Sequence, residues 1–286
     1  MIQYYLYKLG QFLVQNLPLR LSYQVAGFLS DIHYYLSARD RRCVKNNLRV
    51  ILPAPVADDE LARLSRQVFR DFAKYLIDFF YVTGKIDKAY IEKNVVIKNL
   101  EYLPQVLKKG KGAIVLTAHV GNWELGGFII SRLGYPLIAV ALPHKERSVN
   151  NLFNEQRQSQ GLTIVPNNVA IRECIRGLRG NRLVALLGDR DFNATGEIMD
   201  FFGKKTRIPK GPAAFALKTG AAIIPAFLTR EENDHFTLTI EPPIYPPESP
   251  TEQTEKEILR ECVKIIEGAI RRNPTQWYMF QKFWID

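Results

Sequence analysis

The sequence has few cysteines, and none of them is arranged to form a disulfide framework or a structural metal site. Its three cysteines, Cys43, Cys174 and Cys262, are far apart and show no CxxC spacing. An odd and sparse set of this kind argues against stabilising disulfides and against structural zinc. No cluster of Cys, His and carboxylate residues has the spacing of metal ligands. We therefore expect a protein of a reducing compartment that uses neither a metal nor another cofactor.

The sequence also lacks a long apolar run. No segment reaches the roughly 18 uncharged apolar residues expected of a membrane-spanning helix, because the charge-free runs at 21–30 and 133–144 are too short or too polar. The N-terminus has no basic segment followed by an apolar stretch and a small-residue cleavage site, so we expect no signal peptide. Any contact with a membrane is therefore expected at its surface.

What the sequence does have is an excess of positive charge that is concentrated near the N-terminus. The 286 residues include 39 Lys and Arg against 29 Asp and Glu, a formal net charge of +10. Residues 1–50 hold seven basic and two acidic residues, so about a sixth of the chain carries half of this excess. A basic surface attracts the phosphates of nucleic acid or anionic lipid, or an acidic protein. Composition alone does not distinguish these partners.

The first 50 residues combine aromatic and basic side chains. Two helices are predicted, at 3–16 and 20–36, with a break at Pro18. Their aromatic residues are Tyr4, Tyr5, Tyr7, Phe12, Tyr34 and Tyr35, and a basic cluster of Arg39, Arg41, Arg42, Lys45 and Arg49 follows. This pattern is typical of helices that lie in the membrane interface, although a helical hairpin packed on its own domain would share it. We interpret residues 1–50 as membrane-contact helices.

Residues 51–286 have the pattern of an α/β domain. Apolar residues three and four positions apart predict a helix over 58–83, capped by Asp58 or Asp59 and closed by Gly84. Short β-branched runs then alternate with helical stretches, which predicts a mixed, largely parallel sheet flanked by helices. The strands are expected at 95–97, 113–117, 137–141, 162–165, 183–187, 221–227 and 236–240. The helices are expected at 123–133, 148–160, 169–179, 212–219 and 252–272.

A candidate catalytic motif follows the predicted strand at 113–117. His119 stands where that strand ends, and such strand ends carry the sites of α/β folds. Glu124 lies five positions on, which is not the same face of a helix, so the two side chains meet only if the chain turns at Gly121. A carboxylate bonded to one imidazole nitrogen leaves the other free to accept a proton. No Gly-x-Ser-x-Gly elbow accompanies them, so the proton would come from a substrate hydroxyl.

This motif and several others in the same order resemble the lipid A biosynthesis acyltransferases of the lysophospholipid acyltransferase superfamily. Phosphatidylinositol mannoside acyltransferases are similar in the same core. The supporting segments are Gly121-Asn122-Trp123-Glu124, Asn46-Asn47-Leu48, Asn154-Glu155-Gln156-Arg157, Gly188-Asp189-Arg190-Asp191, Asp200-Phe201-Phe202-Gly203, Pro209–Ala213 and Gln276-Trp277. The resemblance covers most of the chain and implies a glycerol-3-phosphate acyltransferase-like fold.

The resemblance implies an enzyme that transfers an acyl chain from an acyl-carrier protein or acyl-CoA to a lipid hydroxyl. In that case His119 is the general base, Glu124 orients it, and Arg157 holds the thioester oxygen or a phosphate. The predicted acceptor is a lipid A precursor. However, the Asp189-Arg190-Asp191 order, followed by Glu197, is more similar to the mannoside branch, where a glutamate at this position pairs with the histidine. The partner of His119 is thus Glu124, Glu197 or both, and a mannoside-type acceptor is the alternative.

Further residues are predicted to bind substrate. The basic segment 204–210 is interpreted as a loop, either solvated or docking lipid phosphates or an acidic carrier protein. Asp189 and Asp191 would form a salt-bridged turn with Arg190 or buttress it. The full set is Gly121, Asn122, Trp123, Asp189, Arg190, Asp191, Lys204, Lys205, Arg207 and Lys210.

The expected location is the cytoplasmic face of the bacterial inner membrane, with anionic lipid and the acyl donor as partners and no nucleic acid. A basic membrane-binding module without catalysis is the remaining alternative, and it leaves His119 and Glu124 unexplained.

Overall fold

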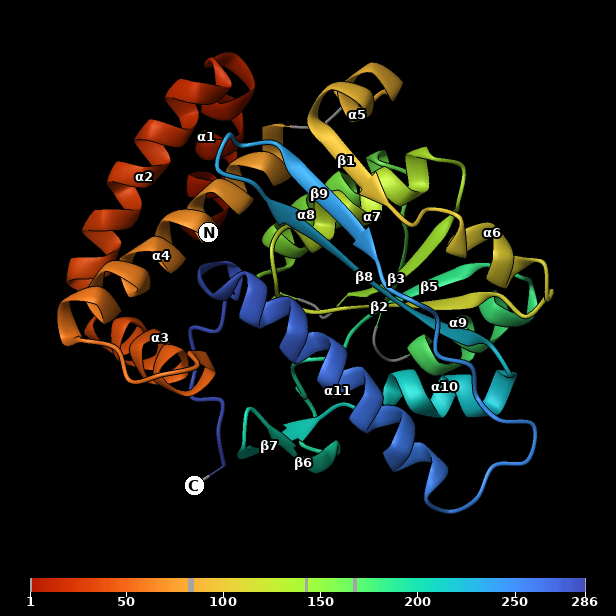
Figure 1. The fold of residues 1–286 in the computed structure, drawn as a ribbon. Helices are drawn as coiled ribbons and strands as arrows, with labels where there is room; N and C mark the ends of the chain where they lie inside the picture. Colours follow the sequence, from red (N-terminus) through yellow and green to blue (C-terminus); the bar gives the residue numbers. More distant parts are fainter. Residues whose placement is uncertain (1, 82–84, 142–143, 167–168, 286) are drawn as a thin grey trace.

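The computed structural model describes residues 2–81, 85–141, 144–166 and 169–285, and it confirms the predicted mixed α/β fold (Figure 1). The described residues form a seven-stranded sheet of order β1-β9-β8-β2-β5-β3-β4. Its strands are β1 (Val95–Lys98), β2 (Ala113–Thr117), β3 (Leu137–Ala141), β4 (Thr163–Pro166), β5 (Leu183–Leu187), β8 (Ala222–Arg230) and β9 (Phe236–Ile240). The five strands from β8 to β4 run parallel, whereas β9 is antiparallel to β8.

Helices cover both faces of this sheet. Along β2, Ala113 and Val115 belong to one apolar core, and Ile114 and Leu116 belong to the other. Successive side chains of a strand point to opposite faces, so a strand covered on both sides is apolar throughout. One face is covered by α6 (Tyr102–Leu107), α7 (Trp123–Arg132) and α8 (Arg147–Ser159), and the other by α9 (Ala170–Arg179), α10 (Gly211–Thr219) and α11 (Thr254–Arg272).

Four helices at the N-terminal end gather beside the sheet (Figure 1). They are α1 (Ile2–Asn16), α2 (Leu19–Leu36), α3 (Ala38–Ile51) and α4 (Asp58–Tyr81), and α4 packs against the other three. The two predicted N-terminal helices are therefore confirmed, while the basic cluster that follows them forms a helix of its own. None of the helices in the described ranges is both long and apolar enough to cross a membrane.

Other boundaries bear on the predictions. The α3 helix continues past residue 50, and the division of the chain at residues 50 and 51 stays a prediction. Gly84, the predicted end of α4, lies outside the described residues. The short helix α5 (Lys88–Asn94) and α6 were not predicted.

The basic segment 204–210 was wrongly interpreted as a loop, because most of it is a strand. β7 (Lys204–Ile208) pairs antiparallel with β6 (Glu197–Phe201) around a tight turn at Phe202 and Gly203. Both turn residues have positive φ, of 51° and 73°, as two-residue hairpin turns require. Thr206 and Ile208 are buried, while Lys204 and Lys205 are exposed. The strand lacks a clear apolar alternation, because exposed Lys204 shares a face with buried Thr206 and Ile208, and Thr206 is itself polar.

Candidate active site

His119 pairs with Asp189 at the edge of the sheet where the parallel strands end. β2 and β5 are parallel neighbours with Thr117 opposite Leu187, so residues two positions beyond each strand lie side by side. The Nδ1 atom of His119 is 2.8 Å from Oδ1 of Asp189, and the backbone N–H of His119 donates to Oδ2 at 3.1 Å. Asp189 is fully buried and His119 is 9% exposed. The pair therefore has the geometry of a base and its orienting carboxylate.

The C-terminal segment completes this pair. The indole N–H of Trp277 donates to Oδ2 of Asp189 at 3.1 Å, and the backbone N–H of Tyr278 donates to the carbonyl of His119 at 2.9 Å. Burial alone would raise the pKa of the Asp189 carboxyl, but the charge of His119 and three hydrogen bonds outweigh it and lower that pKa. Ionised Asp189 accepts a hydrogen bond from the Nδ1–H group, which leaves Nε2 of His119 free to accept a proton.

The predicted pairing of His119 with Glu124 or Glu197 is therefore wrong. Asn122 caps α7, which places Glu124 in the first helical turn, where it binds Arg157 of α8. Glu197 lies on the hairpin, 3.2 Å from Lys210 and 2.8 Å from Lys256. These lysines lower the pKa of Glu197 through hydrogen bonds and charge. The sequence did hold a signal for Asp189, because Asp189 follows its strand at the same offset as His119 follows β2.

Glu124 and Arg157 form a buried ion pair. Nε of Arg157 is 3.0 and 3.1 Å from the two carboxylate oxygens, and Nη2 is 2.5 Å from Oε1. Burial would lower the pKa of the Arg157 guanidinium, but the charge and hydrogen bonds of Glu124 outweigh burial and raise it. Much of the Arg157 fork is thus occupied by Glu124 and is less available to a substrate.

Replacing Glu124 by glutamine is expected to lower the free energy of unfolding by up to about 3 kcal/mol, because Arg157 would be left buried without its counter-charge. Thermal unfolding measures this effect as a lower Tm. Glu60→Gln is the matched control, because the pair of Glu60 with Arg63 is solvent-exposed and contributes little. Equal Tm values for Glu124→Gln and the control would contradict a stabilising role of the buried pair.

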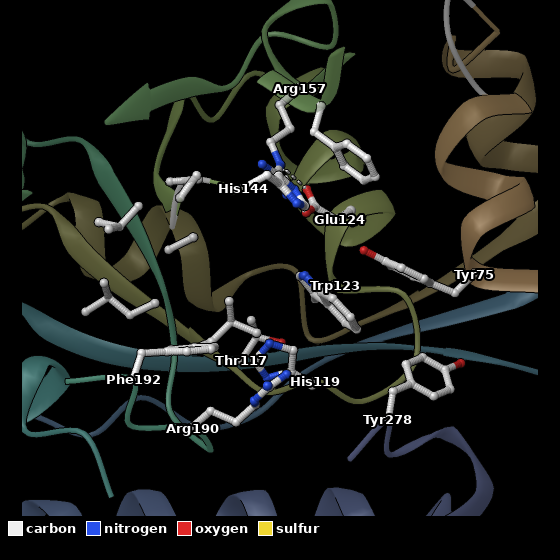
Figure 2. Close-up of a pocket in the computed structure, with 18 of the residues that line it drawn as sticks. Tyr75, Thr117, His119, Trp123, Glu124, His144, Arg157, Arg190, Phe192 and Tyr278 are labelled. Carbon is white, nitrogen blue, oxygen red and sulfur yellow. Dashed lines mark hydrogen bonds and ion pairs between the residues drawn. The ribbon is translucent and has the colours of Figure 1, made fainter. Parts of the chain in front are cut away.

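His119 opens onto a cavity of about 720 Å³ (Figure 2). This volume is typical of a site for a small molecule or cofactor. One end holds His119 and Arg190, and Glu124, Arg157 and His144 lie at the other end. Much of the remaining lining is apolar and comes from strand ends and helices, including Leu137, Ala139, Val140, Leu162, Ala185, Leu186 and Phe153. A long apolar chain can therefore lie in the cavity beside a base.

Trp123 separates the two polar ends of the cavity. Its ring stacks on Tyr75 with centroids 4.4 Å apart, and it meets the ring of His119 edge to face with centroids 5.0 Å apart. Trp123, which was predicted to bind substrate, both packs on its neighbours and lines the cavity. Tyr75 and Trp277 support the site without having been predicted.

Gly121 and Asn122 hold the start of α7 and do not line the cavity. Gly121 has a φ of +62°, and a Cβ there would lie 2.0 Å from the carbonyl oxygen of Leu228, so the close approach requires glycine. Asn122 caps the helix by accepting from the backbone N–H of Leu125 at 3.0 Å. These contacts set the direction in which Trp123 and Glu124 project. A contact of Gly121 or Asn122 with substrate stays a prediction.

Neither predicted arrangement of the Asp189-Arg190-Asp191 segment is found. Asp189 binds His119, and Asp191 accepts from the backbone N–H groups of Asn193 and Gly196 at 3.2 and 2.7 Å. In the described part of the chain, no ion pair joins Arg190 to either aspartate. Arg190 lies beside His119 (Figure 2), donates to Gln281 at 2.9 Å, and keeps its buried Nε without a partner. A cation with an unused donor thus borders the base.

The predicted basic binding residues of the hairpin lie away from the cavity. Lys205 is 3.0 Å from Asp200, Arg207 donates to the carbonyl of Gly196 at 3.3 Å, and Lys210 is held by Glu197. Lys204 is exposed. None of these four lines the cavity that His119 borders. The structure therefore gives them no place at the base, and a role in docking a partner stays a prediction.

These features place a buried histidine–aspartate pair beside a largely apolar cavity. The chain belongs to the bacterial lipid A biosynthesis acyltransferase family, which matches residues 1–285, and it is therefore an acyltransferase. The phosphatidylinositol mannoside acyltransferase of Mycolicibacterium smegmatis is 27% identical over 98% of this chain and 90% of that protein. The Mycobacterium tuberculosis enzyme of that name is 32% identical over 84% of this chain and 76% of that protein. A lipid A biosynthesis acyltransferase of Haemophilus influenzae is 23% identical over 93% of this chain and 82% of that protein.

Proposed function

We propose that this acyltransferase moves a fatty acyl chain from an acyl thioester to a hydroxyl group of a phosphorylated glycolipid. The observation that carries the proposal is the His119–Asp189 pair at the edge of a largely apolar cavity. The pair supplies a base for the hydroxyl, and the cavity supplies a place for the acyl chain.

The reaction needs no acyl-enzyme. Nε2 of His119 takes the proton of the acceptor hydroxyl while the hydroxyl oxygen bonds to the thioester carbonyl carbon. The resulting tetrahedral oxyanion collapses, the C–S bond breaks, and the imidazolium returns the proton to the leaving thiolate. Asp189 stabilises the imidazolium while it exists, because the carboxylate is ionised and accepts from Nδ1.

Arg190 is the better placed cation for the oxyanion. The sequence suggested Arg157 for this role, but Glu124 holds its guanidinium at the other end of the cavity. Arg190 lies beside His119 and lines the same cavity. A positioned donor of this kind stabilises the charge that develops on the carbonyl oxygen.

Two acceptors are consistent with the family, and one experiment separates them. Membership of the lipid A biosynthesis acyltransferase family favours a lipid A precursor. The sequence identities favour a phosphatidylinositol mannoside-type lipid, because they are 27% and 32% to the mannoside enzymes and 23% to the lipid A enzyme. Purified protein is incubated with labelled acyl-carrier protein or acyl-CoA and with each lipid in turn, and products are identified by mass spectrometry. Label in one acylated lipid identifies acceptor and donor together. Absence of transfer in all arms would reject the proposed function.

We also propose that the enzyme lies on the cytoplasmic face of the bacterial inner membrane. The α1 and α2 helices expose large apolar side chains at helical spacing, which we call the apolar face: Tyr5, Leu6, Leu9, Phe12, Leu13, Leu21, Val25, Phe28, Leu29, Ile32, Tyr35 and Leu36. The cavity is lined in part by Tyr7 of α1 and Arg39 of α3, so the N-terminal helices also border the site. An apolar face beside basic residues suits an anionic bilayer surface.

Replacing both Phe28 and Leu29 by serine is expected to weaken binding to phosphatidylglycerol vesicles by about tenfold or more, since each buried apolar side chain contributes about 1.5–3 kcal/mol. Vesicle co-sedimentation at fixed salt measures the change. Ile171→Ser is the control, because Ile171 is equally exposed but lies on α9. If the double variant binds as tightly as the control, the apolar face is not the membrane contact.

A further inference from the structure

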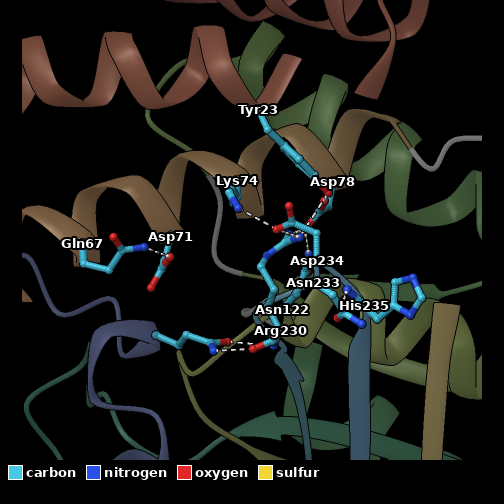
Figure 3. A network of polar contacts seen from close by, with 11 residues as sticks. Tyr23, Gln67, Asp71, Lys74, Asp78, Asn122, Arg230, Asn233, Asp234 and His235 are labelled. Atoms are coloured by element: carbon cyan, nitrogen blue, oxygen red, sulfur yellow. Dashed lines mark hydrogen bonds and ion pairs between the residues drawn. The ribbon is translucent and has the colours of Figure 1, made fainter. Parts of the chain in front are cut away.

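A buried polar network joins α2, α4 and the end of β8 to the start of α7 (Figure 3). Asp78 of α4 is its centre. One carboxylate oxygen accepts from the hydroxyl of Tyr23 at 2.5 Å, and the other accepts from the side-chain amide of Asn122 at 2.8 Å and from Arg230. Asp78 and Asn122 are each 2% exposed. The four side chains therefore form one connected unit inside the protein.

The charges of this network are balanced. Arg230 also donates to the Tyr23 hydroxyl and to Asp234, each at 3.2 Å, and Lys74 binds Asp234 at 2.6 Å. Burial alone would lower the pKa of Arg230, but the negative charge of Asp78 outweighs burial and raises that pKa. Buried ion pairs add little stability relative to apolar packing, and their best-supported use is to fix one arrangement of the parts that they join. None of Tyr23, Asp78 and Arg230 lines the cavity, so their effect on the site is indirect.

The network reaches the cavity through Asn122. Its backbone N–H donates to the carbonyl of Leu228 at 2.8 Å, and its side chain caps α7 while donating to Asp78. The next two residues, Trp123 and Glu124, line the cavity. A shift of Asp78 would therefore be transmitted to the stacked ring beside His119 and to the partner of Arg157.

The other end of the network lies on α2, on the side of the helix opposite the apolar face. Tyr23 belongs to the buried side of α2, whereas Val25, Phe28 and Leu29 project from its exposed side. Tyr23 is the α2 residue that binds Asp78. Contact on the exposed side of α2 therefore acts on the helix that holds the Tyr23 hydroxyl.

We propose that Tyr23, Asp78 and Asn122 form a relay that couples contact of α2 with an anionic lipid surface to the position of Trp123 and Glu124. The inference rests on the proposed function, since it assigns the relay to the acyl-transfer site. Tyr23 and Asp78 are positioning residues that act through the start of α7. When α2 binds the lipid surface, the first turn of α7 becomes ordered, and the cavity beside His119 then takes its reactive shape.

The test compares Tyr23→Phe with Tyr34→Phe. Both substitutions remove one hydroxyl from the buried side of α2 and keep the ring, but the Tyr34 hydroxyl binds the backbone carbonyl of Ala62 at 3.3 Å and not Asp78. Hydrogen exchange is measured at the α7 amides, including that of Leu125, with and without saturating phosphatidylglycerol vesicles. Wild type and Tyr34→Phe are expected to gain protection at these amides on vesicles, and Tyr23→Phe is expected to gain little.

Kinetics supply the second measurement. The ratio of kcat with vesicles to kcat without them is expected to exceed one in wild type and Tyr34→Phe, and to fall to near one in Tyr23→Phe. The relay is overturned if vesicles do not protect α7 in wild type, if Tyr23→Phe responds like wild type, or if Tyr34→Phe loses the response equally. Hydrogen exchange needs no turnover, so an absence of acyl transfer in wild type would reject the proposed function while the exchange data still test the relay.

Discussion

Replacing His119 by alanine is expected to lower kcat by about 10²–10⁴, because the acceptor hydroxyl would lose its general base. The fold should tolerate the change, since Asp189 keeps its hydrogen bonds from the backbone N–H of residue 119 and from Trp277. Initial rates with a labelled acyl thioester measure the loss, and thermal unfolding checks that the variant is folded.

His144→Ala is the control for this experiment. His144 also lines the cavity, but it packs on the ring of Phe153 at 4.7 Å, at the opposite end from His119. Burial and the positive charge of Arg157 lower the pKa of His144. Its removal is expected to change kcat only a few-fold. Near-normal transfer by His119→Ala would reject the proposed mechanism.

Replacing Asp189 by asparagine is expected to lower kcat by up to about 10⁴, because an amide can donate to Nδ1 and hold the imidazole in the wrong tautomer. Steady-state rates with a labelled acyl thioester measure the loss, and thermal unfolding checks that the variant is folded.

Glu124→Gln separates the two carboxylates that could assist His119. Glu124 binds Arg157, so this substitution is expected to lower Tm and to lower kcat much less than Asp189→Asn does. The assignment of Asp189 fails if Glu124→Gln lowers kcat as strongly as Asp189→Asn. The lowered pKa of Asp189 means that its ionised form stabilises the fold at neutral pH, and this stabilisation is lost as pH falls through that pKa.

Most of the sheet could be predicted because its strands are largely apolar. β2, β3 and β5 lie where their apolar runs predicted them, since strands covered on both faces need mostly apolar side chains. β9 also has its predicted bounds, although it alternates apolar residues with Thr237 and Thr239. The β6–β7 hairpin was missed because it lies outside this sheet and its second strand begins with two exposed lysines, which leaves no clear apolar alternation. The short helices α5 and α6 have too few turns to show a clear period.

The candidate base was identified from the sequence, but its partner was not. His119 follows an apolar strand within a motif that includes Glu124, and closeness in sequence favoured that glutamate. Asp189 is 70 positions away and meets His119 only because β2 and β5 are hydrogen-bonded in register. Glu124, which is nearer to His119 in sequence, points to Arg157 instead, because a helix capped by Asn122 begins between His119 and Glu124.

The sequence by itself determined the class of fold, the acyltransferase family and the choice of His119 as the candidate base. Each of these is encoded in local apolar periodicity or in a contiguous motif. Only the tertiary structure decided that Asp189 orients His119, that Arg190 borders the base while Arg157 is held by Glu124, and that Asp78 links α2 to the start of α7. Each of these depends on which strands and helices are neighbours in space. Strand register and helix packing bring together residues whose separation along the chain gives no sign of contact.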